Sequence, residues 1–268
     1  MIQRGASARG VGFVIDHRNV SVAALVFLAL ALGGCQGKNA ALDGTDAIVT
    51  GSTGEPSLRD LAALGARWQN DTSDVQTGLA YAQGLGTIGQ REKRLEVLKT
   101  LAVKNPKEPR LMNIYGKALA EAGRSKEAEQ VLTRSAAQGP ADWKTLSALG
   151  STFDQQGRYQ EARAQYSRAL QASPDNVSVL NNLGMSYALE GNLPKAEGVL
   201  KQAAALPGAA RQPRLAQNLS LIVGLQGRFD EAREIASRNL PPQQVEENMA
   251  YLQKMLAQPN TWQQLKNG

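Results

Sequence analysis

Residues that supply most catalytic and metal-binding chemistry are almost absent from this sequence. Its 268 residues include one histidine and one cysteine, and only 5% are aromatic. The lone cysteine excludes an internal disulfide, and His17 lies in an N-terminal segment that we expect to be removed. Without imidazole or a free thiol, the remaining chain cannot carry Ser-His-Asp or Cys-His catalysis, nor a zinc site built on histidine or cysteine. The carboxylates are spread over expected exposed helix positions, so we predict no enzymatic activity, no small-molecule substrate, no metal and no cofactor.

A strong excess of one charge is also missing. The formal net charge is +6, and residues 1–34 hold three arginines and one aspartate, which leaves +4 for the rest. Acidic and basic side chains are mixed along the expected helices, as in residues 91–96 (REKRLE), and this mixture is typical of a solvated face. We therefore predict no nucleic-acid partner. With few aromatic residues and abundant alanine, leucine, glutamine and glycine, closely packed helices are favoured over sheets.

The N-terminal segment has the order of an export signal. Arginines in the first 18 residues precede an apolar run at 20–32 (VSVAALVFLALAL), and Gly33, Gly34 and Cys35 follow. As a helix the run would extend about 20 Å, short of the roughly 30 Å hydrocarbon core that a transmembrane helix must cross. We therefore predict that residues 1–34 are a cleaved signal peptide.

Residues 32–35 (LGGC) resemble the bacterial lipobox, in which small residues precede a cysteine that carries diacylglycerol. The resemblance implies that Cys35 is lipidated; a chance cysteine after an ordinary cleavage site is the alternative. Several acyl chains make release from the membrane negligible. By resemblance to lipoprotein sorting, Gln36 in place of aspartate implies the outer membrane, with the body on its periplasmic face. Residues 35–56 then form the lipidated cysteine and a flexible tether, which spans roughly 25 Å.

Glycines recur with a fixed period in the rest of the chain. Gly89, Gly123, Gly157 and Gly191 are each 34 residues apart, and Gly227 follows after 36. A period of 34 is typical of the tetratricopeptide repeat, a hairpin of helices A and B. We predict an all-α tetratricopeptide-repeat solenoid of about five hairpins with flanking helices. Its units are 75–108, 109–142, 143–176, 177–210 and 213–242, between capping segments 57–74 and 243–268.

The third unit carries the repeat pattern most clearly. Ten residues occupy characteristic positions of the family: Leu146, Leu149, Gly150, Phe153, Gly157, Tyr159, Ala162, Tyr166, Ala169 and Pro174. Small residues are needed where helices A and B cross closely, which we assign to Gly116, Gly150 and Gly184 on helix A and to Ala128, Ala162, Ala196 and Ala232 on helix B. Glycine at position 15 ends helix A, and Pro106, Pro140 and Pro174 end helix B.

One motif in the first unit is misleading. Residues 84–89 (GLGTIG) match the dinucleotide pattern G-x-G-x-x-G. That pattern requires a preceding strand and a following helix, whereas here a helix precedes it and Gly89 is the turn glycine of the repeat. We therefore predict no dinucleotide site.

The A helices should line a groove, and their positions 9 and 13 should face it. In the first three units these positions are polar: Gln83 and Thr87, Lys117 and Glu121, Ser151 and Gln155. In the last two they are apolar: Met185 and Leu189, Leu221 and Leu225. Exposed apolar patches usually mark binding sites. The hypothesis is that a partner segment buries these four side chains; the C-terminal helix of the chain itself is the alternative cover.

The order of signal, lipobox, tether, repeats and C-terminal helix resembles the TadD-type lipoproteins of the tight-adherence (Flp) pilus secretion system. Besides Cys35, the most specific part is residues 248–265 (NMAYLQKMLAQPNTWQQL). The resemblance implies an outer-membrane-anchored scaffold that assists pilus assembly, with the Tad secretin and other pilus components as partners and a pilotin-like role toward the secretin. An alternative with the same architecture is a lipoprotein scaffold for outer-membrane protein assembly or for cell-wall enzymes.

A carboxylate clamp, with which some repeats grip a peptide C-terminus, is disfavoured. Its places hold Asn182, Arg214 and Asn218, but also Leu79, Gln83, Ser147 and Ser151, where lysine or asparagine would be needed. We expect Asn182 and Asn218 to serve packing.

Overall fold

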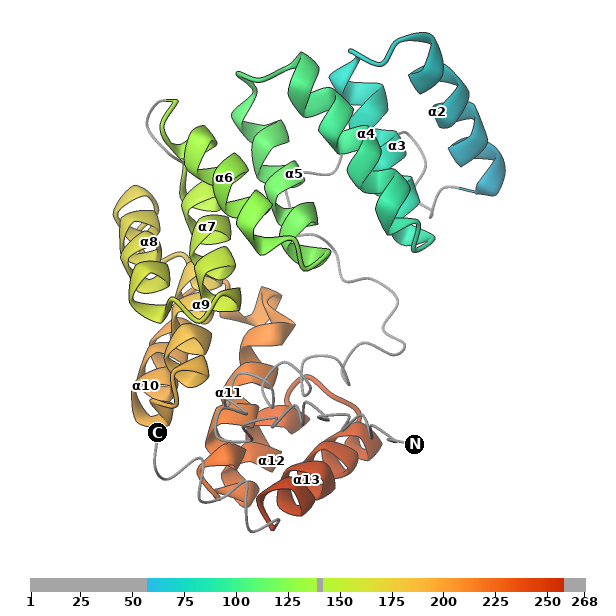
Figure 1. Cartoon of the computed structure of the whole chain (residues 1–268). Helices are drawn as coiled ribbons and strands as arrows, with labels where there is room; N and C mark the ends of the chain where they lie inside the picture. Colours follow the sequence, from blue (N-terminus) through green and yellow to red (C-terminus); the bar gives the residue numbers. More distant parts are fainter. Residues whose placement is uncertain (1–56, 139–141, 258–268) are drawn as a thin grey trace, which may run out of the picture.

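The computed structural model describes residues 57–138 and 142–257, and all regular elements in these ranges are helices (Figure 1). The predicted all-α solenoid class is confirmed. The predicted signal peptide, Cys35, the tether, Pro140 and the end of the C-terminal segment lie outside the described residues.

The helices form consecutive hairpins. Unit 75–108 contains α3 and α4, unit 109–142 contains α5 and α6, and the later units continue in the same way to α11 and α12, while α2 and α13 flank them. The bounds are α2 Leu58–Asn70, α3 Val75–Thr87, α4 Arg91–Lys104, α5 Pro109–Glu121, α6 Ser125–Ala136, α7 Trp143–Gln155, α8 Tyr159–Ala172, α9 Val177–Leu189, α10 Leu193–Ala204, a 3-10 turn η2 Ala209–Arg211, α11 Pro213–Leu225, α12 Phe229–Ser237 and α13 Pro242–Leu256.

Each helix A ends at a glycine in the left-handed region. Gly157 has φ +73°, and the next residue, Arg158, donates its main-chain N–H to Phe153 O at 2.9 Å. The same arrangement recurs at Gly89, Gly123, Gly191 and Gly227. A Cβ at Gly157 would meet no atom within 4 Å, so the demand for glycine is conformational rather than spatial.

The glycines inside helix A are required for a different reason, which is lack of space. A Cβ built on Gly150 would lie 2.7 Å from Cε1 of Tyr166, and one built on Gly116 would lie 2.5 Å from Cγ of Leu132. At Gly184 the corresponding distance to Cγ of Leu200 is 2.7 Å. Position 8 of helix A therefore contacts the side chain at position 24 of helix B, and the alanines at position 20 (Ala128, Ala162, Ala196 and Ala232) are fully buried beside it.

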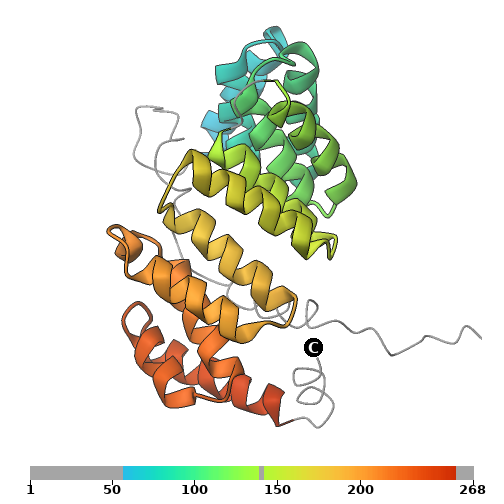
Figure 2. The same cartoon turned by 90° about the vertical axis from the view of Figure 1, so that its left-hand side faces the viewer.

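The apolar core runs along the whole stack as three adjoining clusters. The first joins α2 to α6, the second is centred on α7 and α8, and the third joins α9 to α13. Neighbouring clusters meet within single helices: Ala128 and Leu132 of α6 belong to different clusters, as do Val179 and Leu180 of α9. Figure 2 shows the hairpins stacked in chain order from α2 at one end to α13 at the other. No hairpin buries its apolar side chains alone.

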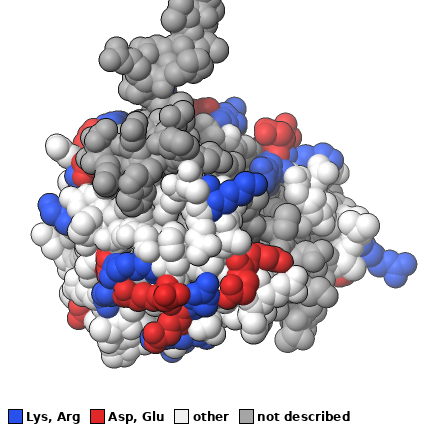
Figure 3. Space-filling view, turned by 90° about the horizontal axis from the view of Figure 1, so that it is seen from below, with Lys and Arg blue, Asp and Glu red and all other residues white. Residues whose placement is uncertain are grey.

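Ion pairs between consecutive units alternate in sign along the stack. Position 21 carries Glu129, Arg163, Glu197 and Arg233 in units two to five. Each contacts an opposite charge in the next element: Glu129 with Arg158 (2.8 Å), Arg163 with Glu190 (2.9 Å), Glu197 with Arg228, and Arg233 with Glu246 of α13 (2.9 Å). Figure 3 shows side chains of both signs interleaved on one face. Displacing a unit by one place would bring like charges together, so these contacts favour one order of stacking.

Glu197 is the most enclosed carboxylate of this series. Its side chain is 12% exposed and accepts hydrogen bonds from Arg228, Lys201 and Gln226, which hold the pKa of Glu197 at about 2. Glu197→Gln should lower the free energy of unfolding at pH 7 by about 1–3 kcal/mol. The pKa of Glu197 is lower in the folded state than in the unfolded state, so its stabilisation is complete above pH 4.5 and is lost as the carboxylate becomes protonated. The stability difference between wild type and Glu197→Gln should therefore shrink as pH falls from about 4.5 towards 2. Thermal melts at several pH values measure this.

The control for this prediction is Glu234→Gln. Glu234 of α12 pairs with Arg238, the residue that follows this helix, and the two side chains are 73% and 67% exposed. Its loss should leave the melting temperature nearly unchanged. Equal effects of the two substitutions would show that the contact between units contributes no more than a surface pair.

Candidate functional site

The A helices form the inner side of the stack. Helices α5 and α7, α7 and α9, α9 and α11, and α11 and α13 contact one another directly, whereas each B helix contacts chiefly the A helices on its two sides. Figure 1 shows the hairpins following an arc. The A helices of neighbouring units contact one another, so they lie on the inside of this arc. This inner face is the candidate partner-binding surface.

The first three units present a polar inner face, as expected. Gln83, Thr87, Lys117, Glu121 and Gln155 are exposed and Ser151 is half-buried. Glu121 forms an ion pair with Arg94 of the preceding unit at 2.7 Å. This half of the inner face is therefore hydrated and of mixed charge.

The expected apolar wall in the last two units needs correction. Leu189 and Leu225 are only 9% and 4% exposed, and Leu225 belongs to the buried cluster that includes Met249 and Leu252 of α13. Helix α9 contacts α11, and α11 contacts α13, so the residues at position 13 of α9 and α11 lie between helices. Met185 and Leu221 pack partly buried against the same cluster. Leu225 is thus buried in the cluster to which α13 also contributes, and Met185 and Leu221 are the two of the four side chains that are only partly buried.

A row of hydrogen-bonded polar side chains crosses three A helices. Asn218 of α11 donates through Nδ2 to Asn181 Oδ1 of α9 at 2.9 Å. Asn181 donates to Asn182 Oδ1 at 3.4 Å, and Asn182 donates to Ser147 Oγ of α7 at 3.1 Å. We call these four residues the amide row. Asn182 and Asn218, which we expected to serve packing, do join helices, but Asn181, which connects them, was not singled out in the sequence.

A buried carboxylate joins units three and four. Asp154, 7% exposed, accepts hydrogen bonds from Tyr166 Oη of α8 at 2.8 Å and from Ser186 Oγ of α9 at 2.6 Å. Burial raises the pKa of Asp154 to about 6, although both hydrogen bonds and the charge of Arg163 act in the opposite direction. Sequence reasoning missed this residue. The available signal was position 12, which holds only glycine or alanine in the other four units.

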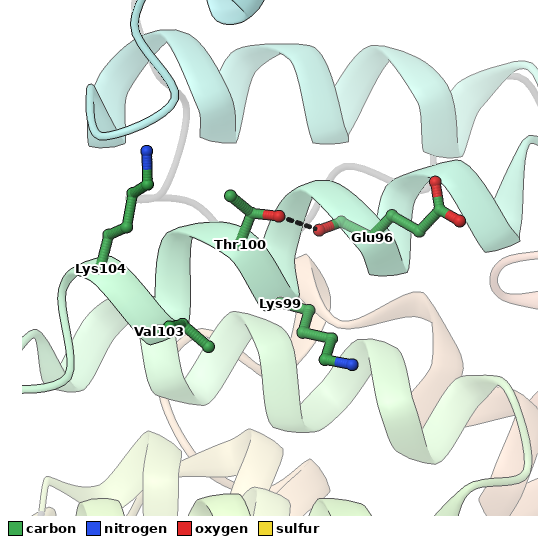
Figure 4. Close-up of a pocket in the computed structure, with 5 residues that line it drawn as sticks. All are labelled: Glu96, Lys99, Thr100, Val103 and Lys104. Atoms are coloured by element: carbon green, nitrogen blue, oxygen red, sulfur yellow. Dashed lines mark hydrogen bonds between the residues drawn. The ribbon is translucent and has the colours of Figure 1, made fainter.

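One surface pocket is lined by residues of α4 alone. In this pocket, drawn in Figure 4, Lys99 and Lys104 point in different directions, and Thr100 Oγ1 donates to Glu96 O at 2.9 Å. Within 57–138 and 142–257, no three His, Cys, Asp or Glu residues are grouped to hold a metal. Over the same ranges, no helix combines the length and apolarity that a membrane span requires.

The tetratricopeptide-repeat family profile matches residues 89–142 and 147–210 of this chain. Among solved structures, a tetratricopeptide-repeat protein from Parabacteroides merdae is similar with a TM-score of 0.62 and 14% identity, covering 73% of this chain and 77% of its own. A thermophilic repeat protein from Thermus thermophilus is similar at TM-score 0.58 and 21% identity, over 66% and 97% of the two chains. These similarities show the fold.

A third similar structure is PilW, described as a widely conserved type IV pilus biogenesis factor. It aligns with a TM-score of 0.56 and 19% identity, covering 74% of this chain and 92% of its own. Sequence comparison with curated proteins finds no match.

We predict that Asp154→Asn changes the pH dependence of stability. A carboxyl whose folded pKa is about 6, against 3.8 for the free group, binds a proton more tightly when folded. The unfolding free energy of the wild type should therefore fall as pH rises from about 4 to 6, at a slope of at most about 1.4 kcal/mol per pH unit. Asparagine can accept one of the two hydrogen bonds through Oδ1 and donate through Nδ2 to the other hydroxyl oxygen, and it carries no charge, so the variant should gain relative to the wild type over that range.

Urea unfolding at pH 4, 5, 6 and 7 measures this difference. Asp230→Asn, which alters an exposed carboxylate, is the control. Parallel pH profiles for wild type and Asp154→Asn would contradict the assignment.

Proposed function

We propose that this protein, a tetratricopeptide-repeat solenoid, is a lipid-anchored scaffold that holds protein partners and assists assembly of the Flp/Tad pilus machinery at the outer membrane. Tetratricopeptide repeats bind proteins, and the continuous inner face formed by the A helices is the observation that carries the scaffold role.

The pilus role rests on two supports. Residues 248–265 resemble the C-terminal segment of TadD-type lipoproteins, and the first part of this segment lies in α13, where Met249 and Leu252 close the core of the last unit. The fold is also shared with PilW, whose description names type IV pilus biogenesis. At 19% identity that likeness concerns the fold, so the segment resemblance carries more of the proposal.

The place in the cell follows from the lipobox. With Cys35 lipidated and Gln36 after it, the body stands on the periplasmic face of the outer membrane, tethered by residues 37–56. From that position a pilotin-like role toward the secretin is feasible, because the lipid would carry the bound secretin to the outer membrane. A scaffold for outer-membrane protein assembly or for cell-wall enzymes would share this anchoring. The position of the gene separates the two roles. Neighbouring genes for a Flp pilin, a secretin and a traffic ATPase would support the pilus role, and a neighbourhood without them would support the alternative.

Two substitutions test the anchor. Cys35→Ser should abolish incorporation of labelled palmitate and release the protein from the outer membrane, because the described repeats pack without lipid. Gln36→Asp should keep the label but shift the protein to the inner membrane. Fractionation should also show less secretin in the outer membrane for both variants. Palmitate labelling of Cys35→Ser would refute lipidation at this cysteine, and unchanged secretin in both would refute the pilotin-like role.

A further inference from the structure

We propose that the junction between units three and four is a pH-sensitive hinge, closed by a proton that Asp154 holds between Tyr166 and Ser186. We call these three residues the carboxyl cluster. When the proton is lost, the packing of α9 against α7 and α8 loosens, and the part from α2 to α8 moves against the part from α9 to α13. The hinge rests on the fold alone, and its effect on partners rests on the proposed scaffold function.

The carboxyl cluster places three polar groups where the other units are apolar. Asp154, Tyr166 and Ser186 are 7%, 1% and 0% exposed. Position 24 is tyrosine in unit three, and its hydroxyl donates to Asp154 Oδ2 at 2.8 Å. The other four units hold apolar side chains at position 24: Leu98, Leu132, Leu200 and Ala236. Position 12 is glycine or alanine in those units, so among the five units only the third encloses a carboxyl group at this place.

The carboxyl cluster lies where two apolar clusters adjoin. Asp154 belongs to α7 and accepts a hydrogen bond from Ser186 Oγ of α9 at 2.6 Å, across the junction. Within α9, Val179 packs with the apolar cluster of α7 and α8, whereas Leu180 belongs to the cluster that continues to α13. Each side of the junction therefore keeps an apolar core of its own when the two sides move apart.

Charged groups from α8 and α9 act on Asp154. Burial is the main cause of its raised pKa, to which Glu190 of α9 adds and which Arg163 of α8 opposes. Burial also raises the pKa of Tyr159, with smaller contributions from Asp154 and Glu190. Arg163 forms an ion pair with Glu190 at 2.9 Å, and its Cζ lies 4.8 Å from the ring centre of Tyr187. Because its charge is already engaged by a second carboxylate, Arg163 offsets only part of a charge on Asp154.

The carboxyl cluster can be hydrogen-bonded in both protonation states but is charged in only one. A protonated Asp154 donates its O–H to one hydroxyl oxygen and accepts from the other hydroxyl, so the junction encloses no charge. An ionised Asp154 accepts from both hydroxyls and leaves a buried charge, which is costly. With a pKa of about 6, Asp154 is mostly protonated at pH 5 and mostly ionised at pH 7.5. The described residues contain no histidine, the side chain that ordinarily titrates in this range.

Opening of the hinge should become easier as pH rises. Water reaches Asp154 in the open form, where its pKa returns towards the 3.8 of the free group, so the closed form binds the proton more tightly. Stabilisation of the closed form is complete below pH 3.8 and is lost as pH rises through about 6. Between pH 5 and pH 7.5 the ratio of open to closed molecules should rise about tenfold. Because α7 and α9 both belong to the inner face, a partner that contacts both is held more firmly at pH 5.

Pairs of spin labels on introduced cysteines measure the opening in the lipidated full-length protein in detergent. Ala137→Cys with Ala205→Cys joins units two and four and spans the hinge, whereas Val103→Cys with Gln171→Cys joins units one and three and does not. All four residues occupy position 29 and are exposed, so the two pairs are matched. The protein without added cysteines shows any label taken up by Cys35. From pH 5 to pH 7.5, the population of longer distances should rise about tenfold for the first pair and stay constant for the second.

Two substitutions in the carboxyl cluster identify the group that titrates. Asp154→Asn cannot ionise, so the first pair of labels should lose its pH dependence. Ser186→Ala removes a hydrogen bond that lowers the pKa of Asp154, so the opening should move to higher pH. Asp230→Asn, at an exposed carboxylate, should leave the opening unchanged. Melting temperatures of all variants show that they fold, and the titration of the labelled protein with its native Asp154 does not depend on them.

Three outcomes would overturn the hinge. The first is a distance distribution of the Ala137 and Ala205 pair that stays the same from pH 5 to pH 7.5. The second is equal widening of both pairs, which would show that the whole stack loosens. The third is an unchanged transition in a folded Asp154→Asn protein. None of these measurements involves the outer membrane or a partner, so their failure leaves the scaffold function intact, which the Cys35→Ser experiment tests separately.

Discussion

The close crossing of helices A and B within each hairpin is the contact on which the rest of the structure depends. Gly116, Gly150 and Gly184 lie directly against the side chains at position 24, with no room for a Cβ between them. This approach brings the alanines of position 20 into the same interior and leaves the other faces of both helices for neighbouring units. Because each hairpin is thin, its apolar residues are buried only by stacking, and the core runs from α2 to α13.

Stacking joins neighbouring units through two kinds of polar contact. The outer junctions carry ion pairs of alternating sign, from Glu129 with Arg158 to Arg233 with Glu246, and these favour one order of units. The inner junctions are joined by neutral polar contacts, of which the amide row is the most extended. The ion pairs that favour one order of units therefore lie at other contacts than the amide row.

Much of the fold could be predicted from sequence because its determinants are local. A glycine in the left-handed region at each turn and small residues at fixed positions produce a period that is readable without coordinates. The inner face was less predictable. Leu189 and Leu225 were expected on an open wall, but both are buried in the stack, where α9 contacts α11 and α11 contacts α13. Asp154 and Asn181 each acquire one partner from a neighbouring unit, Ser186 and Asn218 respectively. The unusual residue at position 12 marked Asp154 in the sequence, but its partner could not be predicted from its own unit.

A pair of glycine substitutions tests the helix crossing most directly. Gly150 and Gly198 both lie inside helices, and alanine at either should gain about 0.5–1 kcal/mol of helix propensity. A Cβ at Gly198 meets nothing within 4 Å, whereas at Gly150 it would lie 2.7 Å from the buried Tyr166 ring. Thermal melts should therefore show a higher melting temperature for Gly198→Ala and a lower one for Gly150→Ala, which overpacking destabilises by about 1–3 kcal/mol. Equal stabilisation by both substitutions would contradict a close crossing at position 8.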